Sequence, residues 1–309
     1  MKSLTPAKGR PRKKRFGTVA IIGRPNSGKS TLLNRLVGTK VSIVSEKPQT
    51  TRHLIRGVLN HPRGQAVFVD TPGIHKPGYE LNRRMLQCVH EAMATVDLLL
   101  LITDASQSFG SGERFVLDLL AQTGKKCILL LNKIDRIPKN KLLPMMEFYS
   151  TQYTFKELIP ISARDGTQLD VLAEKIFEYL PIGEPQFAEE YYTDSSERFM
   201  VAELIREKVL GHTREEIPYT TAVLIETFDE SDRESKRLIR IAASVVVEKS
   251  SQQAIVVGRG ASLIKRIGIE ARKEIEALLD TRVFLELRVR TLENWRNNNS
   301  FLQSVGISG

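Results

Sequence analysis

A glycine-rich segment near the N-terminus carries the residue types that bind phosphate groups. Residues 23–30 read GRPNSGKS, which matches the spacing G-x-x-x-x-G-K-[ST] between a predicted strand and a predicted helix. Glycine lets successive backbone amides turn toward an anion, the lysine adds a mobile positive charge, and the last hydroxyl can bind Mg²⁺. Phosphate contacts are therefore expected from Gly23, Arg24, Pro25, Asn26, Ser27, Gly28, Lys29, Ser30 and Thr31.

A second motif, residues 70–73 (DTPG), ends an apolar run at 66–69. Its aspartate can hold a Mg²⁺ shell through water, and its glycine can donate a backbone amide to a γ-phosphate. The loop at 49–52 (QTTR) lies between the two motifs, and a threonine there should complete the Mg²⁺ shell, although the sequence leaves open which one. Nucleotide contacts are expected from Asp70, Thr71, Pro72 and Gly73, and Mg²⁺ ligands from Ser30, Thr50, Thr51 and Asp70.

The third motif, residues 132–135 (NKID), decides which base is bound. Its aspartate can accept two hydrogen bonds from the N1–H and the exocyclic amine of guanine, whereas adenine would leave a buried carboxylate unpaired. Residues 162–164 (SAR) follow the next apolar run, where their backbone can support the guanine O6. These motifs predict GTP rather than ATP, with contacts from Asn132, Lys133, Asp135, Ser162, Ala163 and Arg164.

The elements that must position these motifs alternate between apolar strands and amphipathic helices. This pattern predicts a mostly parallel sheet covered on both faces, with ligands at the carboxyl ends of the strands. Strands are expected at 16–22, 66–69, 97–104, 127–131 and 158–161, and helices at 32–37, 80–95, 111–122 and 167–180.

A second and smaller unit follows residues 181–197, which contain two prolines and no hydrophobic period and therefore read as a linker. Helices are expected at 198–210 and 262–279, and strands at 219–228, 237–248 and 281–290. The turn at 258–261 would let the backbone approach a sugar-phosphate, although alone it also fits a simple connection between helices. Taken alone, the simple connection is the favoured interpretation. If the turn does bind a sugar-phosphate backbone, as in RNA, the contacts would come from Gly258, Arg259, Gly260, Ala261, Lys265 and Arg266.

Charge and composition limit the remaining possibilities. The chain has 309 residues and a net charge of +10, and residues 1–15 contain seven basic side chains and no acidic one. This tail is expected to be disordered, and it could contact RNA, contact an anionic membrane or only solubilise the chain. No run of about 18 apolar residues predicts a membrane span, and Cys88 and Cys127 are expected to be reduced thiols.

The segments GRPNSGKST, QTTR, DTPG, NKID and SAR, followed by VVGRGASLIKRIG, resemble the Era-like GTPases over nearly all of residues 16–309. The resemblance implies an α/β fold: a Ras-like P-loop G domain at 16–180 with a mixed, mostly parallel sheet, a linker at 181–197, and a smaller α+β type II KH domain at 198–309. A KH domain grips four single-stranded nucleotides through its G-x-x-G loop.

The resemblance also implies partners and a location. It implies binding of GTP and GDP, binding of 16S ribosomal RNA near its 3′ end, and a role in maturation of the small ribosomal subunit. It further implies a cytoplasmic protein that associates peripherally with the inner face of the cell membrane, and we expect a monomer. The KH loop of the family normally ends in glycine, and this chain departs from that pattern with Ala261.

Slow hydrolysis is expected because Ile74 stands where Ras-like enzymes have the glutamine that orients water. In the family, the asparagine of the P-loop is implicated in holding a K⁺ that replaces an arginine finger, and Asn26 occupies that position here. Catalytic contributions are expected from Asn26, Lys29, Thr50, Thr51 and Gly73.

Two alternative functions remain open at this point. The first is a GTPase whose basic tail and second unit chiefly attach it to a membrane. The second is a metabolic P-loop kinase, against which the guanine-selecting Asn132 and Asp135 argue.

Overall fold

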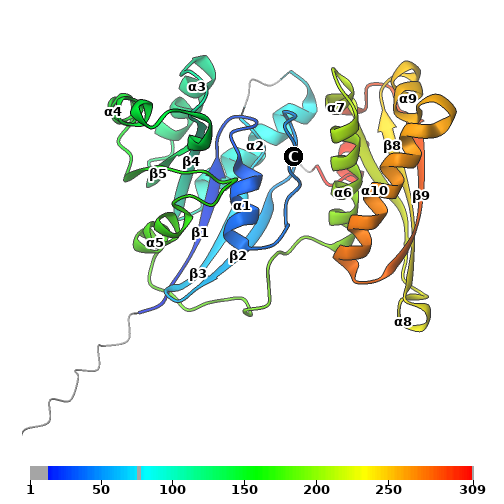
Figure 1. Cartoon of the computed structure of the whole chain (residues 1–309), viewed down its shortest axis with the longest axis horizontal. Helices are drawn as coiled ribbons and strands as arrows, with labels where there is room; N and C mark the ends of the chain where they lie inside the picture. The colour runs from blue at the N-terminus through cyan, green and yellow to red at the C-terminus, as the bar shows by residue number, and fades with distance from the viewer. Residues whose placement is uncertain (1–12, 75–77, 308–309) are drawn as a thin grey trace, which may run out of the picture.

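The computed structural model describes residues 13–74 and 78–307. Two α/β units lie side by side and are joined by an extended segment (Figure 1). Residues 1–12 of the expected basic tail lie outside the described residues. The expectation that the tail extends to position 15 is not met, because Arg15 already pairs with Gly64 in the first strand and its amide donates to the Arg63 carbonyl.

The first unit is built on a mixed sheet of six strands in the order β2-β3-β1-β4-β5-β6. All neighbours are parallel except β2 and β3, which are antiparallel. The predicted mostly parallel sheet is therefore confirmed. The strands are β1 (Arg15–Ile22), β2 (Ile55–His61), β3 (Gly64–Asp70), β4 (Leu98–Asp104), β5 (Cys127–Asn132) and β6 (Glu157–Pro160).

Helices cover both faces of this sheet because successive strand residues point to opposite sides. In β4, for example, Leu98 and Leu100 join the core under α1 and α5, whereas Leu99 and Leu101 join the core under α2, α3 and α4. Both cores are apolar, which explains the uninterrupted apolar runs in the sequence. The helices are α1 (Lys29–Val37), α2 (Glu80–Thr95), α3 (Ser111–Ala121), α4 (Leu142–Gln152) and α5 (Leu169–Tyr179).

The second unit has a sheet in the order β7-β8-β9, in which β8 is antiparallel to β7 and parallel to β9. Helices α6 and α10 pack on one face of this sheet, and α6 lies nearest the first unit (Figure 1). Its elements are α6 (Glu197–His212), α7 (Ile217–Thr220), β7 (Ala222–Asp229), α8 (Arg233–Lys236), β8 (Leu238–Val247), α9 (Ser250–Val257), α10 (Ser262–Leu279), β9 (Arg282–Thr291) and α11 (Asn299–Ser304).

Short 3-10 turns complete the described elements, at Ile134–Arg136, Lys139–Lys141, Arg259–Ala261 and Trp295–Asn297. One expected boundary is wrong: residues 219 and 220 are not the start of a strand but the end of α7. Pro218 stands in the first turn of that helix, where proline is tolerated. The Thr221 hydroxyl then donates to the Ile217 carbonyl.

The linker between the two units follows the free edge of β2. The Val58 amide donates to the Tyr192 carbonyl at 2.9 Å, the Thr193 hydroxyl donates to the Arg56 carbonyl at 2.7 Å, and the Asn60 amide group donates to the Glu189 carbonyl at 2.8 Å. Glu197, expected as the last linker residue, is instead the first residue of α6, whose N-terminus is capped by Ser196.

The chain segment after β9 returns to the first unit. Trp295, Phe301, Leu302 and Ile307 pack with Leu81 and Met85 of α2 in a shared apolar cluster. Arg84 of α2 donates to the Ile307 carbonyl at 2.7 Å. Along the part of the chain that the structure describes, no helix is both long and apolar enough to span a bilayer.

Candidate functional site

A cleft of about 590 Å³ opens at the carboxyl ends of β1, β3 and β5. The structure brings the five motifs together around it. Its lining includes members of each of the phosphate loop, the loop before β2, the DTPG motif, the NKID motif and the SAR motif: Pro25, Asn26, Gly28, Lys29, Ser30, Thr31, Gln49, Thr50, Thr51, Gly73, Asn132, Lys133, Asp135, Ala163 and Arg164.

Several of the expected contact residues do not line the cleft. The Thr71 hydroxyl donates to the Ile21 carbonyl at 2.8 Å, and Pro72 is buried beside it. Arg24 points away to Glu113 of α3, at 2.7 Å. Gly23 packs against the Ile102 carbonyl. These residues hold the shape of the cleft instead of facing its interior.

Position 28 in the phosphate loop needs glycine for steric reasons. A Cβ on Gly28, which has φ of +105°, would lie 2.2 Å from the Asn132 side-chain nitrogen. Asn132 itself donates to the Ser27 carbonyl at 2.7 Å and accepts from the Ala163 amide at 2.9 Å. Asn132 therefore ties the phosphate loop to the SAR loop, and the close approach of Gly28 makes this possible.

Lys29 lies under the phosphate loop, 6% exposed. Its ammonium group donates to the Arg24 carbonyl at 2.9 Å and to the Gly23 carbonyl at 3.3 Å. Burial lowers the pKa of Lys29 to about 8, while the nearby charge of Asp70 raises it in part. A cation held in a desolvated loop interacts strongly with incoming phosphate charge.

Hydroxyl groups converge on Asp70, which is fully buried at the end of β3. Its Oδ2 accepts from Ser30 at 2.7 Å, Ser42 at 3.1 Å and Thr51 at 3.3 Å. Its Oδ1 has no hydrogen-bond partner among residues 13–74 and 78–307. Burial raises the pKa of Asp70. A hard cation prefers such oxygen ligands, so this cluster fits Mg²⁺.

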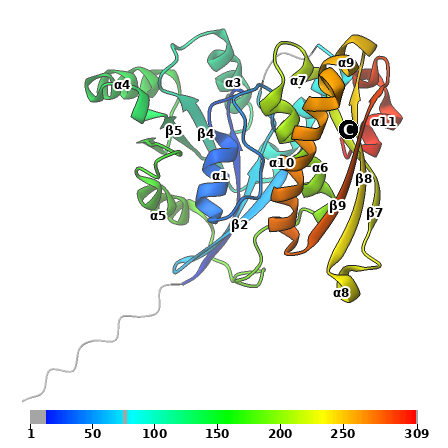
Figure 2. The ribbon, with the colours of Figure 1, turned by 45° about the vertical axis from the view of Figure 1, so that its right-hand side comes forward.

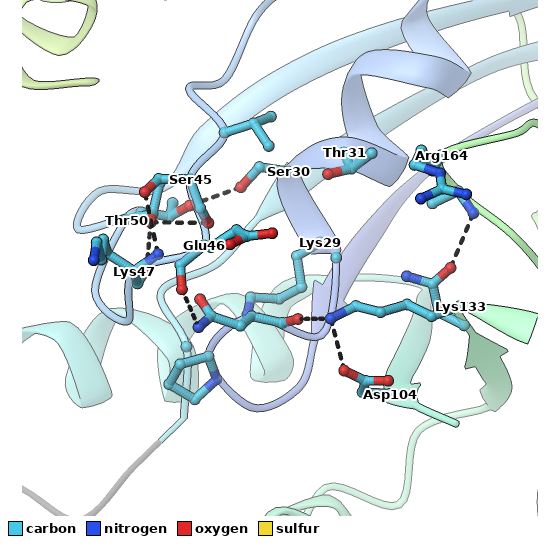
Figure 3. A pocket seen from close by; sticks show the side chains of 18 of the residues that line it. Lys29, Ser30, Thr31, Ser45, Glu46, Lys47, Thr50, Asp104, Lys133 and Arg164 are labelled. Atoms are coloured by element: carbon cyan, nitrogen blue, oxygen red, sulfur yellow. Dashed lines mark hydrogen bonds and ion pairs between the residues drawn. The ribbon is translucent and has the colours of Figure 1, made fainter. Parts of the chain in front are cut away.

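The two threonines of the QTTR loop point in different directions. The Thr51 hydroxyl lies 2.8 Å from the Ser30 hydroxyl, within the oxygen cluster around Asp70. The Thr50 hydroxyl instead donates to the Lys47 carbonyl at 2.5 Å (Figure 3). The structure therefore places Thr51, and not Thr50, beside Ser30 and Asp70. Sequence reasoning missed Ser42, which belongs to no motif.

The carboxylate of Asp135, which is predicted to select the base, lies in the lining of the cleft. Its Oδ1 accepts from the Ser162 hydroxyl at 2.8 Å, and its Oδ2 pairs with the Arg164 guanidinium at 3.0 Å. Lys133 reaches across the cleft and donates to the Asn26 carbonyl at 2.7 Å and to Asp104 at 2.6 Å (Figure 3). Asp104, at the end of β4, was also missed from sequence because it stands outside the recognised motifs.

The turn expected to contact RNA connects α9 to α10. Gly258 has φ of +75°, and a Cβ there would lie 2.8 Å from the Leu263 side chain. Gly260 and Ala261 are both left-handed, with φ of +57° and +61°. Arg259, Lys265 and Arg266 are exposed. The turn is thus tightly folded, with its cations free to reach outward.

A groove of about 320 Å³ runs beside this turn, between α10 and β9. In Figure 2 both elements come forward on the same side of the second unit. The groove has an apolar floor and basic edges, which suits unstacked bases with phosphates along the rim. It is lined by Ile264, Lys265, Gly268, Ile269, Arg272, Leu285 and Leu287.

The fold and the cleft define a P-loop GTPase joined to a KH-type domain. A family model described as a 50S ribosome-binding GTPase matches residues 18–133, and a KH domain model matches residues 216–296. The GTPase Era of Geotalea uraniireducens is 44% identical over 292 residues, covering 94% of this chain and 97% of that protein. The GTPase Era of Heliobacterium modesticaldum is 45% identical over 294 residues, covering 95% and 97%. This chain belongs to the Era family of GTPases.

Solved structures agree with this assignment over 96% of the chain. An Aquifex aeolicus Era variant bound to GDP and AlF4⁻ is 36% identical, with a TM-score of 0.91 over 96% of this chain and 100% of that chain. Era in complex with MgGDPNP and nucleotides 1506–1542 of 16S ribosomal RNA has a TM-score of 0.92 at the same identity and coverage. The expected G domain and KH domain are confirmed, and the chain is a GTPase.

Proposed function

We propose that this chain is a GTP-controlled switch that binds 16S ribosomal RNA near its 3′ end during assembly of the small ribosomal subunit. One observation carries the proposal. The chain matches, over 96% of its length, an Era structure that holds both MgGDPNP and a 16S ribosomal RNA segment. This chain has both the cleft that the nucleotide motifs line and the groove beside the KH turn. Their presence supports assigning both ligands to this chain.

In the nucleotide site, each residue has a role that its position supports. Lys29 neutralises charge on the β- and γ-phosphates, Asp135 selects guanine, and the Gly73 amide contacts the γ-phosphate. Mg²⁺, when bound, would supply positive charge that offsets the negative charge of the phosphates. Ser30 and Thr51 would hold it directly and Asp70 through water, because their oxygen atoms already converge.

We also propose a K⁺ site between Asn26 and the loop before Thr50. The Asn26 amide group donates to the Glu46 carbonyl at 2.5 Å, so this side chain lies against the loop in question. Ile74 is buried and cannot orient water by hydrogen bonding, which leaves a place for a cation that assists hydrolysis. GTP turnover should be faster in KCl than in NaCl at equal ionic strength. Equal rates in the two salts would contradict the K⁺ site.

The domain boundaries and the remaining partners belong to the same proposal. With the bounds corrected for Arg15 and Glu197, we place the G domain at 15–180, the linker at 181–196 and the KH domain at 197–309. We propose that the chain is a cytoplasmic monomer. The basic tail would add peripheral contact with the anionic inner membrane surface. Flotation of anionic liposomes with the full chain and with a chain lacking residues 1–12 tests this contact, because equal flotation would exclude the tail as the anchor.

The RNA proposal is tested by filter binding of an oligonucleotide from the 3′ end of 16S ribosomal RNA. Binding should be tighter with a GTP analogue than with GDP, because γ-phosphate contacts order the loops that face the KH domain. Replacing Arg259 and Lys265 by glutamine should weaken binding and reduce its salt dependence. Equal affinity in the two nucleotide states would contradict the switch, and unchanged affinity of the double variant would contradict the groove.

A further inference from the structure

The loop that carries Thr51 is held on both sides by the KH domain. On the N-terminal side, Arg206 of α6 donates through one terminal nitrogen to the Thr50 carbonyl and through the other to the Gln49 carbonyl. Arg206 is 3% exposed and Glu203 is 5% exposed. The Arg206 guanidinium donates through Nε to Glu203 Oε1 at 2.8 Å and through Nη2 to Glu203 Oε2 at 2.7 Å. A residue of the KH domain therefore fixes the peptide group immediately before Thr51.

On the C-terminal side, Arg52 reaches in the opposite direction, from the loop into the KH domain. Its guanidinium donates to the Thr221 carbonyl at 2.7 Å and to the Pro218 carbonyl at 3.1 Å, and its carbon lies 5.6 Å from the centre of the Trp295 ring. Arg52 is 2% exposed. Thr51 is thus the single residue between two guanidinium anchors that cross the same interface.

The start of the loop meets the same helix. Glu207 of α6 accepts from the Val44 amide at 2.9 Å and from Lys40 at 2.6 Å. Arg206 and Glu207 follow Glu203 by three and four residues, so both lie next to Glu203 on the helix surface. This face of α6 therefore contacts the loop both at its start and next to Thr51.

The chemistry of these contacts indicates a role beyond holding the two domains together. Burying a guanidinium and a carboxylate carries a desolvation penalty that apolar packing avoids. The same interface has an apolar contact nearby, between Trp295 and α2. A forked donor on two successive carbonyls, in contrast, fixes the orientation of the peptide and hence the direction in which the next side chain points.

We propose that Arg206, supported by Glu203, is a positioning residue of the GTP site, through which the KH domain sets Thr51 for Mg²⁺ and the γ-phosphate. The inference rests on the proposed Mg²⁺ role of Thr51. The RNA-binding domain then contributes to the nucleotide site without touching the nucleotide. Because γ-phosphate contacts distinguish GTP from GDP at this loop, Arg206 should affect retention of GTP and leave retention of GDP unchanged.

The experiment measures dissociation rates of fluorescent GDPNP and GDP from the full-length chain in the presence of Mg²⁺. Four variants are compared with the wild type: Arg206→Lys, Glu203→Gln combined with Arg206→Met, Thr51→Ala, and Arg198→Met. The paired substitution avoids leaving Glu203 buried without its partner. Arg198 is the matched control, because it lies on the same helix and donates to the Ile225 carbonyl inside the KH domain.

We expect the first three variants to release GDPNP about tenfold faster, the loss of about one good hydrogen bond, and to release GDP at the wild-type rate. Arg198→Met should match the wild type for both nucleotides. If Thr51→Ala accelerates GDPNP release and both Arg206 variants do not, the positioning role is wrong and the Mg²⁺ assignment stands. Faster release of both nucleotides from both Arg206 variants would show general damage and also overturn the inference. Unchanged release from Thr51→Ala would overturn the Mg²⁺ assignment and this inference with it.

Discussion

The nucleotide cleft and the KH turn are both proposed to bind phosphate-bearing ligands, and the structure builds them by different means. In the cleft, Lys29, Asp70 and Asn132 are buried and linked to one another's loops by hydrogen bonds. At the KH turn, Arg259 and Lys265 are exposed, and only the backbone of the turn is fixed.

This difference determines how tolerant each site should be. A preorganised, desolvated site loses much of its function when one group is displaced, because the remaining buried groups are left without partners. A site of exposed cations and a shaped backbone loses affinity in small steps, one phosphate contact at a time. Substitutions in the cleft should therefore have larger effects than equivalent substitutions at the turn.

The largest expected effect is on base selection. Asp135→Asn should weaken GTP binding about 100-fold, because the neutral amide cannot accept both guanine N–H groups. Xanthosine triphosphate should recover part of this loss, since its 2-oxo group can accept from the new amide. Competition titrations with the two nucleotides measure the change, and undiminished GTP affinity would contradict the assignment of the base site.

A glycine-to-alanine substitution should cost more stability in the phosphate loop than in the KH turn. Gly28→Ala should lower the free energy of unfolding by about 2 kcal/mol, because it adds left-handed strain and displaces Asn132. Gly260→Ala should lower it by only about 1 kcal/mol, since a Cβ there meets no atom within 4 Å. Urea unfolding of both variants gives the two values. Equal losses of unfolding free energy in the two variants would contradict the difference in packing between the phosphate loop and the KH turn.

The buried lysine should make nucleotide binding depend on pH. The pKa of Lys29, about 8 in the folded chain, should rise when phosphates bind. Above about pH 8, where Lys29 is largely neutral in the free protein, nucleotide binding should therefore take up a proton. GTP affinity should then fall by up to about tenfold per pH unit above about pH 8. Calorimetry in buffers of different ionisation enthalpy detects the proton. Guanosine, which lacks phosphates, serves as the control and should show no such uptake.

The smallest expected effect concerns the departure at the KH turn. Ala261 occupies a left-handed conformation, so Ala261→Gly should stabilise the chain by about 0.5–1 kcal/mol. Ala254→Gly, in the exposed interior of α9, should instead destabilise it by about 1 kcal/mol. Thermal melting compares the two variants, and a lower melting temperature for Ala261→Gly would mean that the strain is absent.

Most of the G domain could be predicted from sequence because its strands are apolar on both faces and its motifs are local. Strand β2 was missed because Arg56 and Gly57 interrupt its apolar residues, and α4 because its apolar residues do not form one clear stripe. The short α7 and the packing of the C-terminal segment depend on contacts with distant residues, which no local pattern reveals.

The residues of the candidate site likewise fall into those that a local motif predicts and those that only the fold brings together. Motif residues such as Lys29 and Asp135 follow from spacing alone, because the loop that holds them is encoded by its own neighbours. Ser42 and Asp104 were missed because their roles depend on what the fold brings beside them. The choice between Thr50 and Thr51 could not be made from sequence, since adjacent hydroxyls differ only in the direction that the folded loop gives them.

The path of the linker has a consequence for the G domain as a separate unit. Strand β2 ends the sheet, and three polar groups along its outer edge are bonded by residues 189–193: the Val58 amide, the Arg56 carbonyl and the Asn60 side chain. A chain that stopped after α5 would leave this row of groups open to any passing strand, which is how sheets join edge to edge and aggregate. The linker thus covers the edge strand of the G domain and protects that domain from aggregation, in addition to connecting it to the KH domain.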